Sequence, residues 1–190
     1  MRAEGPCTTT CASVTVTVNA QPTISIAASP RTTLLPGQTT TLTATVTPAA
    51  GNTITWYRNG NVVPGATGLT LLVSVSDLGT YTARATTGAG CTALFNDVPI
   101  IAEGSALVFV FPNPSRGQFQ VRVYNQQGKQ ISVLVHNARG QRVYLERKIT
   151  SAPYTRMDVD LRSAAAGQYT VTVVDSDDQI IGTKSIIIYH

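Results

Sequence analysis

Hydrophobic and polar residues alternate with a period of two over short stretches of the first half of the chain. The clearest stretch is 39–47, TTTLTATVT, in which Leu42, Ala44 and Val46 share one face and threonines occupy the other. This is the period of a β-strand with one buried face. Similar runs predict strands at 24–28, 53–56, 69–75, 80–85 and 98–102. Turn residues separate these runs at roughly ten-residue spacing, which indicates an antiparallel β-sandwich.

The second half repeats the strand pattern with different turns. Runs at 107–111, 119–124, 131–136, 142–149, 154–161, 169–174 and 180–189 predict seven further strands. Pro112 and Pro114 are expected to end the incoming strand, because proline fixes φ and lacks an N–H donor. The predicted fold class is therefore all-β, with two consecutive antiparallel β-sandwich domains.

A change in composition marks the boundary between the two halves. Residues 1–102 contain four Arg, three acidic residues and 23 Thr, whereas residues 103–190 contain ten Lys or Arg, seven acidic residues and five Thr. The polar segment 103–106, beginning Glu103-Gly104-Ser105, lies at this change and is the predicted linker. It joins a domain at 21–102 to a domain at 107–190.

An internal repeat concerns the first residues of the chain. Cys7-Thr8 followed by 14–16 matches Cys91-Thr92 followed by 98–100, an offset of 84 residues. Residues 1–20 are therefore interpreted as the terminal strand of a truncated preceding repeat, which implies a longer parent protein. Pairing of the three cysteines, Cys7, Cys11 and Cys91, stays open, and one partner is expected in the missing upstream region.

Charge and motif content argue against several classes of function. The net charge of +4 comes from basic and acidic residues that are interleaved, which argues against nucleic-acid binding. The longest apolar runs are far shorter than a membrane-spanning segment. The only histidines are His136 and the terminal His190, and nucleotide-binding or hydrolase motifs are absent. We therefore predict no catalytic residues, no cofactor and no metal.

Two groups of acidic residues could in principle support catalysis or metal binding. Asp158 and Asp160 lie two apart on a predicted strand and could support acid–base chemistry, but a solvated sheet face is the favoured interpretation. The segment 175–178, Asp-Ser-Asp-Asp, offers oxygen ligands for Ca²⁺ but lacks the Gly and distal Glu of a calcium loop. It is favoured as a hairpin turn.

Trp56 and the sequence Asp77-Leu78-Gly79-Thr80-Tyr81 resemble an immunoglobulin-like sandwich over residues 21–102. The resemblance implies that Trp56 is a core residue and that the Tyr81 hydroxyl bonds to upstream backbone. Ala83 stands where many family members carry a cysteine, and Ala44 is the candidate opposite it. We therefore expect no disulfide between the sheets.

The C-terminal 85 or so residues resemble the type A C-terminal sorting domain of the type IX secretion system of Bacteroidota. The shared pattern is Phe-Pro-Asn-Pro-x-x-Gly, a turn with glycine, Asp-Leu, Gly-x-Tyr-x-Val-x-Val, and a lysine before an apolar end. Ala164-Ala165-Ala166 replaces the Leu-Pro that family members often have. The residues that carry the motif are Pro112, Asn113, Pro114, Gly117, Gly140, Gly167, Tyr169 and Lys184.

This resemblance implies an address label that directs the protein through the periplasm to the cell surface or the medium. The implied partners are the type IX translocon and a sortase-like peptidase that cuts near the linker. Attachment of the upstream part to surface lipopolysaccharide, or its release, would follow. The Ig-like module is expected to act as a spacer or adhesive element with a glycan or protein ligand.

Two alternatives remain for the function of the whole chain. A carbohydrate-binding module would need exposed aromatic side chains, and the sequence offers Trp56, expected to be buried, and Tyr57. The chain could also be the accessory region of a larger secreted enzyme. Fold alone does not identify a ligand.

Overall fold

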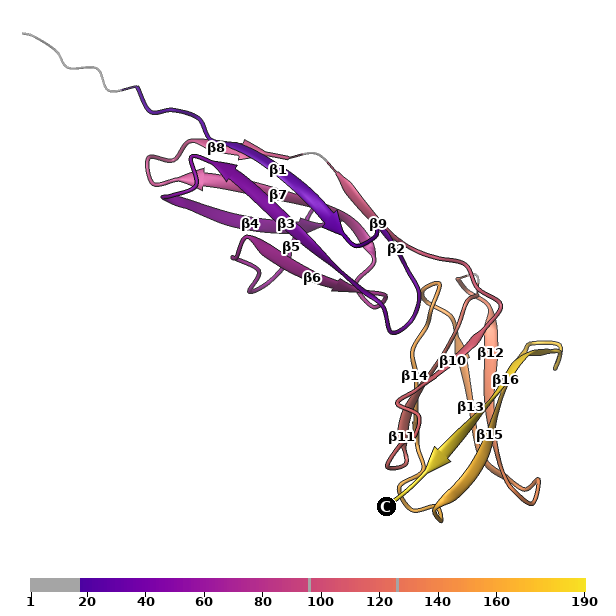
Figure 1. Ribbon diagram of the computed structural model, residues 1–190. Coiled ribbons are helices and arrows are strands. Elements are labelled where there is room, and N and C mark those ends of the chain that lie inside the picture. Colours follow the sequence, from indigo (N-terminus) through magenta and orange to yellow (C-terminus); the bar gives the residue numbers. More distant parts are fainter. Residues whose placement is uncertain (1–17, 96, 126) are drawn as a thin grey trace, which may run out of the picture.

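The computed structural model describes residues 18–95, 97–125 and 127–190, and the regular elements in these residues are β-strands (Figure 1). The strands before residue 103 are β1 Thr23–Ser29, β2 Thr33–Leu34, β3 Thr39–Thr47, β4 Asn52–Arg58, β5 Asn61–Val62, β6 Thr70–Ser74, β7 Gly79–Thr87, β8 Thr92–Leu94 and β9 Val98–Ala102. The later strands are β10 Val108–Phe111, β11 Gln118–Val123, β12 Gln130–Asn137, β13 Arg142–Ile149, β14 Met157–Asp160, β15 Gly167–Asp175 and β16 Ile180–Ile188.

The first unit is a sandwich of two sheets. One sheet has the order β1-β3-β6, and the other has the order β2-β9-β7-β4-β5 with β8 paired to β7. Alternate residues of each strand turn inward, so that the period of two in the sequence becomes one buried face. The shared core includes Leu42, Trp56, Tyr81 and Ile100, each at most 2% exposed.

The first unit differs from its sequence prediction in its short strands. The strands β2, β5 and β8 have two or three residues each, too few for an alternation to be recognised. β2 pairs with β9 in parallel, with Thr33 opposite Ile101, which is an exception to the predicted antiparallel pairing at this edge. This pairing with β2 holds the end of β9, and the chain continues from there to the second unit.

The second unit is also a two-sheet sandwich, with orders β10-β11-β14 and β13-β12-β15-β16, and these strands pair antiparallel. An isolated parallel bridge joins Ser115 to Ile188 at the edge of β16. Its core is separate from that of the first unit and includes Phe119, Val133, Val171 and Ile186. The all-β prediction is confirmed for both units. The C-terminus lies at the end of the second unit that points away from the first (Figure 1).

The predicted strand at 154–161 is too long at its start, because β14 covers Met157–Asp160 alone. The preceding residues form a turn in which the Thr155 hydroxyl accepts hydrogen bonds from the backbone N–H groups of Ser151 and Ala152, at 3.0 and 3.2 Å. The predicted repeat strand at 1–20 lies almost wholly outside the described residues, as do Cys7 and Cys11. Cys91 is a half-buried free thiol.

Candidate functional site: a surface around the C-terminal strand

The outer edge of β16 is covered by the segment that follows β10. The Asn113 side chain donates from Nδ2 to the Ser185 carbonyl at 3.0 Å and accepts at Oδ1 from the Ile187 N–H at 3.1 Å. Two residues later, the Ser115 N–H donates to the Ile187 carbonyl at 2.9 Å, and the Tyr189 N–H donates to the Ser115 carbonyl at 3.0 Å. This segment therefore supplies the partners that a neighbouring strand would supply to an edge strand.

Gly117 permits the turn that brings this segment against the residues that follow β14. Its φ is +92°, and a Cβ atom here would lie 2.7 Å from the Arg162 Cα. Its carbonyl accepts a 2.7 Å hydrogen bond from the Leu161 N–H. Ser115, 1% exposed, completes the turn: its hydroxyl donates to the Gln118 carbonyl and accepts from the Gly117 N–H. The Pro-Asn-Pro segment and the Asp160-Leu161 segment are thereby packed together.

The Gly-x-Tyr segment at the start of β15 contacts the same terminal strand from its other side. Gly167 pairs with Ile188, and Tyr169 pairs with Ile186. The Tyr169 side chain is 5% exposed, and its hydroxyl donates to the Ala165 carbonyl at 2.6 Å. The last residue, His190, lies with its Nε2 2.9 Å from the Ala164 carbonyl.

Gly140 and Lys184 are less closely joined to this surface. Gly140, at φ +74°, ends a turn in which Asn137 Oδ1 accepts from the N–H groups of Arg139 and Gln141. Residues 137–139 of this turn share a shallow hollow with residues 165–169. Lys184 is opposite Val171 in the middle of β16, with its side chain exposed. The edge contact with Asn113 begins at the next residue, Ser185.

Two residues at this surface, Ser115 and Arg116, were not predicted from the sequence. The guanidinium carbon of Arg116 lies 5.7 Å from the centre of the Tyr189 ring, which ties the turn after Pro114 to the chain end. Ser115 and Arg116 occupy the two unspecified positions of the motif, so the motif itself contains no signal for them. We define the edge surface as residues 112–117 together with residues 185–190.

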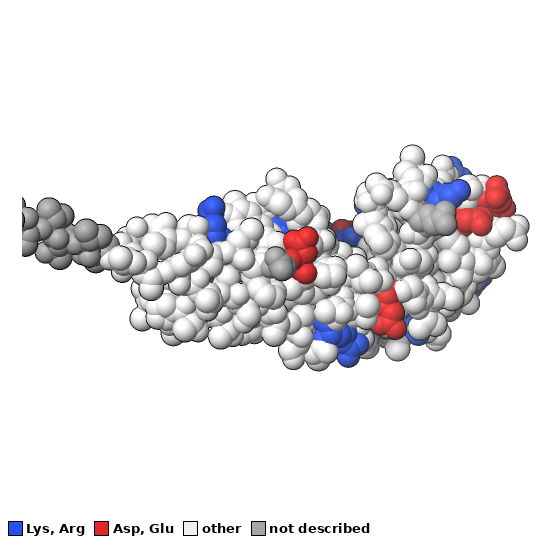
Figure 2. Space-filling view, turned by 90° about the horizontal axis from the view of Figure 1, so that it is seen from above, with Lys and Arg blue, Asp and Glu red and all other residues white. Residues whose placement is uncertain are grey.

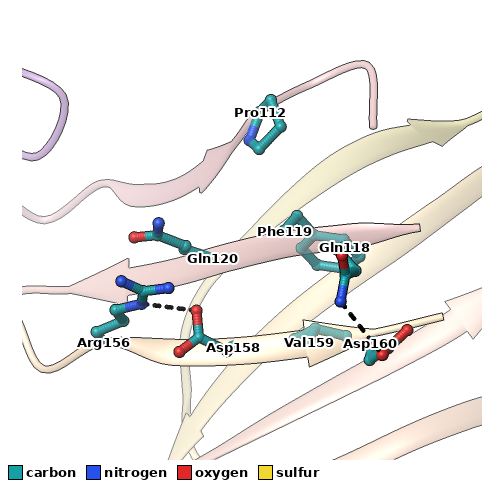
Figure 3. Close-up of a pocket in the computed structure, with 8 residues that line it drawn as sticks. All are labelled: Pro112, Gln118, Phe119, Gln120, Arg156, Asp158, Val159 and Asp160. Carbon is teal, nitrogen blue, oxygen red and sulfur yellow. Dashed lines mark hydrogen bonds and ion pairs between the residues drawn. The ribbon is translucent and has the colours of Figure 1, made fainter. Parts of the chain in front are cut away.

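The acidic pair of β14 lies on a solvated sheet face. A hollow over β11 and β14 is lined by Gln118, Gln120, Asp158 and Asp160 among others (Figure 3). Asp158 pairs with Arg156 at 2.6 Å, while Asp160 pairs with Arg162 at 2.7 Å. Hydrogen bonds from Arg162 lower the pKa of Asp160 to about 2. An ionised, exposed carboxylate of this kind is not a proton donor near neutral pH.

The acidic segment that follows β15 forms the expected hairpin turn. Asp175 Oδ1 accepts hydrogen bonds from the backbone N–H groups of Asp177 and Gln179, both at 2.9 Å. Asp178 adopts a positive φ of 58°. Among the described residues, no three His, Cys, Asp or Glu side chains gather in a way that could hold a metal ion. His136 is half-buried in β12, between β13 and β15.

In the first unit, Trp56 and Tyr81 are internal. The Trp56 side chain is fully buried and donates from Nε1 to the Gly68 carbonyl at 2.8 Å. The Tyr81 hydroxyl donates to the Asp77 carbonyl. Ala44 and Ala83 both lie in the core, on strands of the two opposing sheets. Tyr57, half-buried, lies under the Arg84 guanidinium at 5.4 Å.

Charged residues are few in the first unit and more numerous in the second, and both units carry both signs. The face in Figure 2 shows isolated Lys, Arg, Asp and Glu groups over a mostly uncharged surface. No helix in the described part of the chain is both long and apolar enough to cross a membrane.

Family comparison assigns both units. Residues 109–189 match the family of secretion system C-terminal sorting domains, and residues 21–102 match the immunoglobulin domain family. The chain is therefore an Ig-like domain followed by a C-terminal sorting domain of the type IX secretion system. The sorting domain indicates export to the cell surface or the medium and interaction with the type IX machinery. Neither domain family is catalytic.

Similar solved structures include the human OSCAR ligand-binding domain, 13% identical, covering 89% of this chain and 98% of that one, with a TM-score of 0.34. Another is a Bacteroides ovatus protein of a mixed-linkage glucan utilization locus in complex with a heptasaccharide, 17% identical, covering 90% and 48%, with a TM-score of 0.37. An I-band fragment of titin is 17% identical, covering 90% and 66%, with a TM-score of 0.34. These similarities concern fold alone. No curated protein matches the chain in sequence.

Proposed function

We propose that the type IX translocon recognises the sorting domain as a folded object, through the edge surface of residues 112–117 and 185–190. The Ig-like domain serves in this proposal as a spacer or adhesive module carried to the outside. The observation that carries the proposal is the hydrogen bonding of Asn113 and Ser115 to the backbone of Ile187. It joins the first and last parts of the sorting motif, 74 residues apart, into one surface.

The later steps of the proposal concern the connecting peptide. A sortase-like peptidase cuts between residues 103 and 107, after which the upstream part is attached to surface lipopolysaccharide or released. The position of this peptide between two separately packed cores supports the proposal, because a cut there leaves both cores intact.

The alternative of carbohydrate binding receives less support. Trp56 is fully buried, and its indole N–H is already bonded to the Gly68 carbonyl. Among the described residues of the Ig-like domain, the large hydrophobic side chains that are exposed are aliphatic: Val62, Leu69, Leu72, Leu94 and Ile101. A glycan array with residues 21–102 tests this alternative directly. The same observations agree with a role as the accessory region of a larger secreted enzyme, because such a region would also be an exported spacer.

Secretion of a reporter tests the proposal. Residues 107–190, which contain a complete core, are fused to a reporter with a signal peptide and expressed in a bacterium that has a type IX system. We expect the reporter at the surface or in the medium, and Asn113→Ala to reduce its export. Lys129→Ala, at an exposed site in the turn between β11 and β12, is the matched control and should be exported normally. Retention of the unmodified fusion in the periplasm would contradict the proposal.

A further inference from the structure

One residue of the connecting peptide is bonded to both domains. The Glu103 N–H donates to the Leu34 carbonyl of the Ig-like domain at 3.0 Å. The Glu103 carbonyl accepts a 2.7 Å hydrogen bond from the Tyr154 hydroxyl of the sorting domain. Both backbone polar groups of this residue are therefore occupied, one by each domain.

Tyr154 is firmly placed for this contact. Its side chain is 2% exposed and makes edge contacts with the rings of Phe109 and Tyr124, at centroid distances of 5.7 and 5.5 Å. A Cβ atom at Gly104 would lie 3.7 Å from the Tyr124 ring, so the connecting peptide passes directly over this aromatic group. Tyr154 and Tyr124 thus contact the segment that follows β9, and Phe109 packs against Tyr154.

Arg122 forms a second connection between the domains. It lies on β11 and is 5% exposed. Its Nη2 donates to the Ser76 hydroxyl of the Ig-like domain at 2.8 Å, and its Nη1 donates to the Tyr154 carbonyl at 3.2 Å. A shallow gap beside this contact is lined by both domains, with Gln38 and Thr39 facing Phe111 and Arg156.

Ser76 is presented by a well-supported turn. The Tyr81 hydroxyl binds the Asp77 carbonyl, and the Arg58 guanidinium pairs with the Asp77 carboxylate at 3.1 Å. The Ser74 hydroxyl donates to the same carboxylate and accepts from the Ser76 N–H. The Ig-like domain therefore offers Ser76 from a fixed position.

The acceptors of the buried guanidinium are neutral: a hydroxyl, a backbone carbonyl and the Gln120 side-chain amide. Burial lowers the pKa of Arg122, as does the nearby charge of Arg156, and the charges of Asp158 and Asp77 offset part of this decrease. A buried cation with neutral partners costs free energy that water would recover when the contact opens. The junction is thus specific in its geometry, and the cost of burying the guanidinium reduces the free energy that holds it closed.

We propose that Arg122 and Tyr154 form a latch that docks the sorting domain on the Ig-like domain. The connecting peptide, residues 103–107, is largely exposed, and the latch slows its proteolysis by holding both backbone groups of Glu103 until the junction opens. A protease that binds the chain around Glu103 as an extended strand needs the backbone groups that the latch occupies there. Where it concerns the sortase-like peptidase, this inference rests on the proposed function. The latch itself is a property of the isolated chain.

Limited proteolysis of the purified 190-residue chain by a broad-specificity protease tests the latch, with cut sites assigned by mass spectrometry. Tyr154→Phe, Ser76→Ala and Arg122→Ala each remove a contact across the junction. Cleavage within 103–107 should accelerate about five- to thirtyfold, the population change that corresponds to one or two lost hydrogen bonds. Arg139→Ala, in an exposed turn at the opposite end of the sorting domain, should leave the rate unchanged.

Two further measurements distinguish loss of the latch from damage to the sorting domain. The double variant Ser76→Ala/Arg122→Ala should be cut no faster than Arg122→Ala, because both changes remove the same contact. Hydrogen exchange of β12 and β15 should be unaltered in the Ser76 and Tyr154 variants, which shows an intact sorting core. Unchanged cleavage of 103–107 in all three single variants overturns the latch. Because no secretion machinery is present, that result leaves the proposed function untouched, and a failed secretion assay leaves the latch untouched.

Discussion

Tyr81 and Tyr169 make the same hydrogen bond in two different domains. Each hydroxyl donates to the backbone carbonyl four residues earlier in the chain, that of Asp77 and that of Ala165. Each ring is almost fully buried, at 2% and 5% exposed, near the start of a central strand of its sheet. The two domains thus use one device to fasten a loop to the strand that follows it.

Replacing either tyrosine with phenylalanine removes the hydroxyl and leaves the carbonyl without this partner. We expect Tyr81→Phe and Tyr169→Phe each to lower the free energy of unfolding by about 1–3 kcal/mol. Chemical denaturation followed by fluorescence and circular dichroism measures the loss. Tyr124→Phe, at a tyrosine that is 44% exposed, is the comparison variant and should lose less. Equal losses of unfolding free energy in all three variants would show that the shared hydrogen bond does not stabilise the domains more than an exposed hydroxyl does.

The Asn113 side chain is expected to protect one amide of the terminal strand. In Asn113→Ala, the Ile187 N–H loses its acceptor, so its hydrogen exchange should accelerate about tenfold, the effect of a hydrogen bond worth about 1 kcal/mol or slightly more. Asn113→Asp keeps an acceptor oxygen for Ile187 but loses the donor to the Ser185 carbonyl. The amide of Ile187 should therefore stay protected in this second variant. Rapid exchange in the unmodified chain would refute the contact.

Gly117 is expected to tolerate no side chain. An alanine there combines a positive φ with a Cβ atom 2.7 Å from the Arg162 Cα, a backbone atom that cannot rotate away. We expect Gly117→Ala to cost about 2–5 kcal/mol, the sum of backbone strain and overpacking. Gly88→Ala is the control, because a Cβ atom at Gly88 would meet nothing within 4 Å. Thermal unfolding measures the loss of stability. Equal losses in the two variants would argue against the close approach of Gly117 to Arg162.

The pair of Asp160 and Arg162 predicts a pH dependence at the acid end. The pKa of Asp160 lies at about 2, below its ordinary 3.8, because Arg162 donates hydrogen bonds to the ionised carboxylate. A lowered pKa in the folded state means that the pair stabilises the fold above about pH 3.8 and that this contribution is lost as the pH falls through about 2. Arg162→Gln should return the pKa of Asp160 toward 3.8. Carboxyl titration by NMR measures it, with Arg139→Ala as the unaffected control.

The period of two in the sequence was sufficient to predict most strands and the fold class. β3, β9 and β13 have the predicted limits, because alternation reports directly which side of a strand is buried. The motif around Tyr81 indicated the Ig-like fold because the contact of Tyr81 with Asp77 is local in the chain. Trp56 added a large apolar residue in a predicted strand, although its core neighbours come from distant strands. The resemblance to sorting domains likewise rests on short local patterns, of which the Pro-Asn-Pro motif is one.

The contacts that build the two candidate surfaces were decided by tertiary structure. Asn113 meets Ile187 across 74 residues, and Arg122 meets Ser76 across 46. A local pattern shows that a side chain is polar, but it does not show which distant group that side chain will bond to. The same limit explains the missed pairing of β2 with β9 and the late start of β14, where a turn held by Thr155 replaces the first predicted strand residues. The sequence by itself determined which residues turn inward, because that depends on period alone, whereas packing of the two sandwiches decided which surface groups meet.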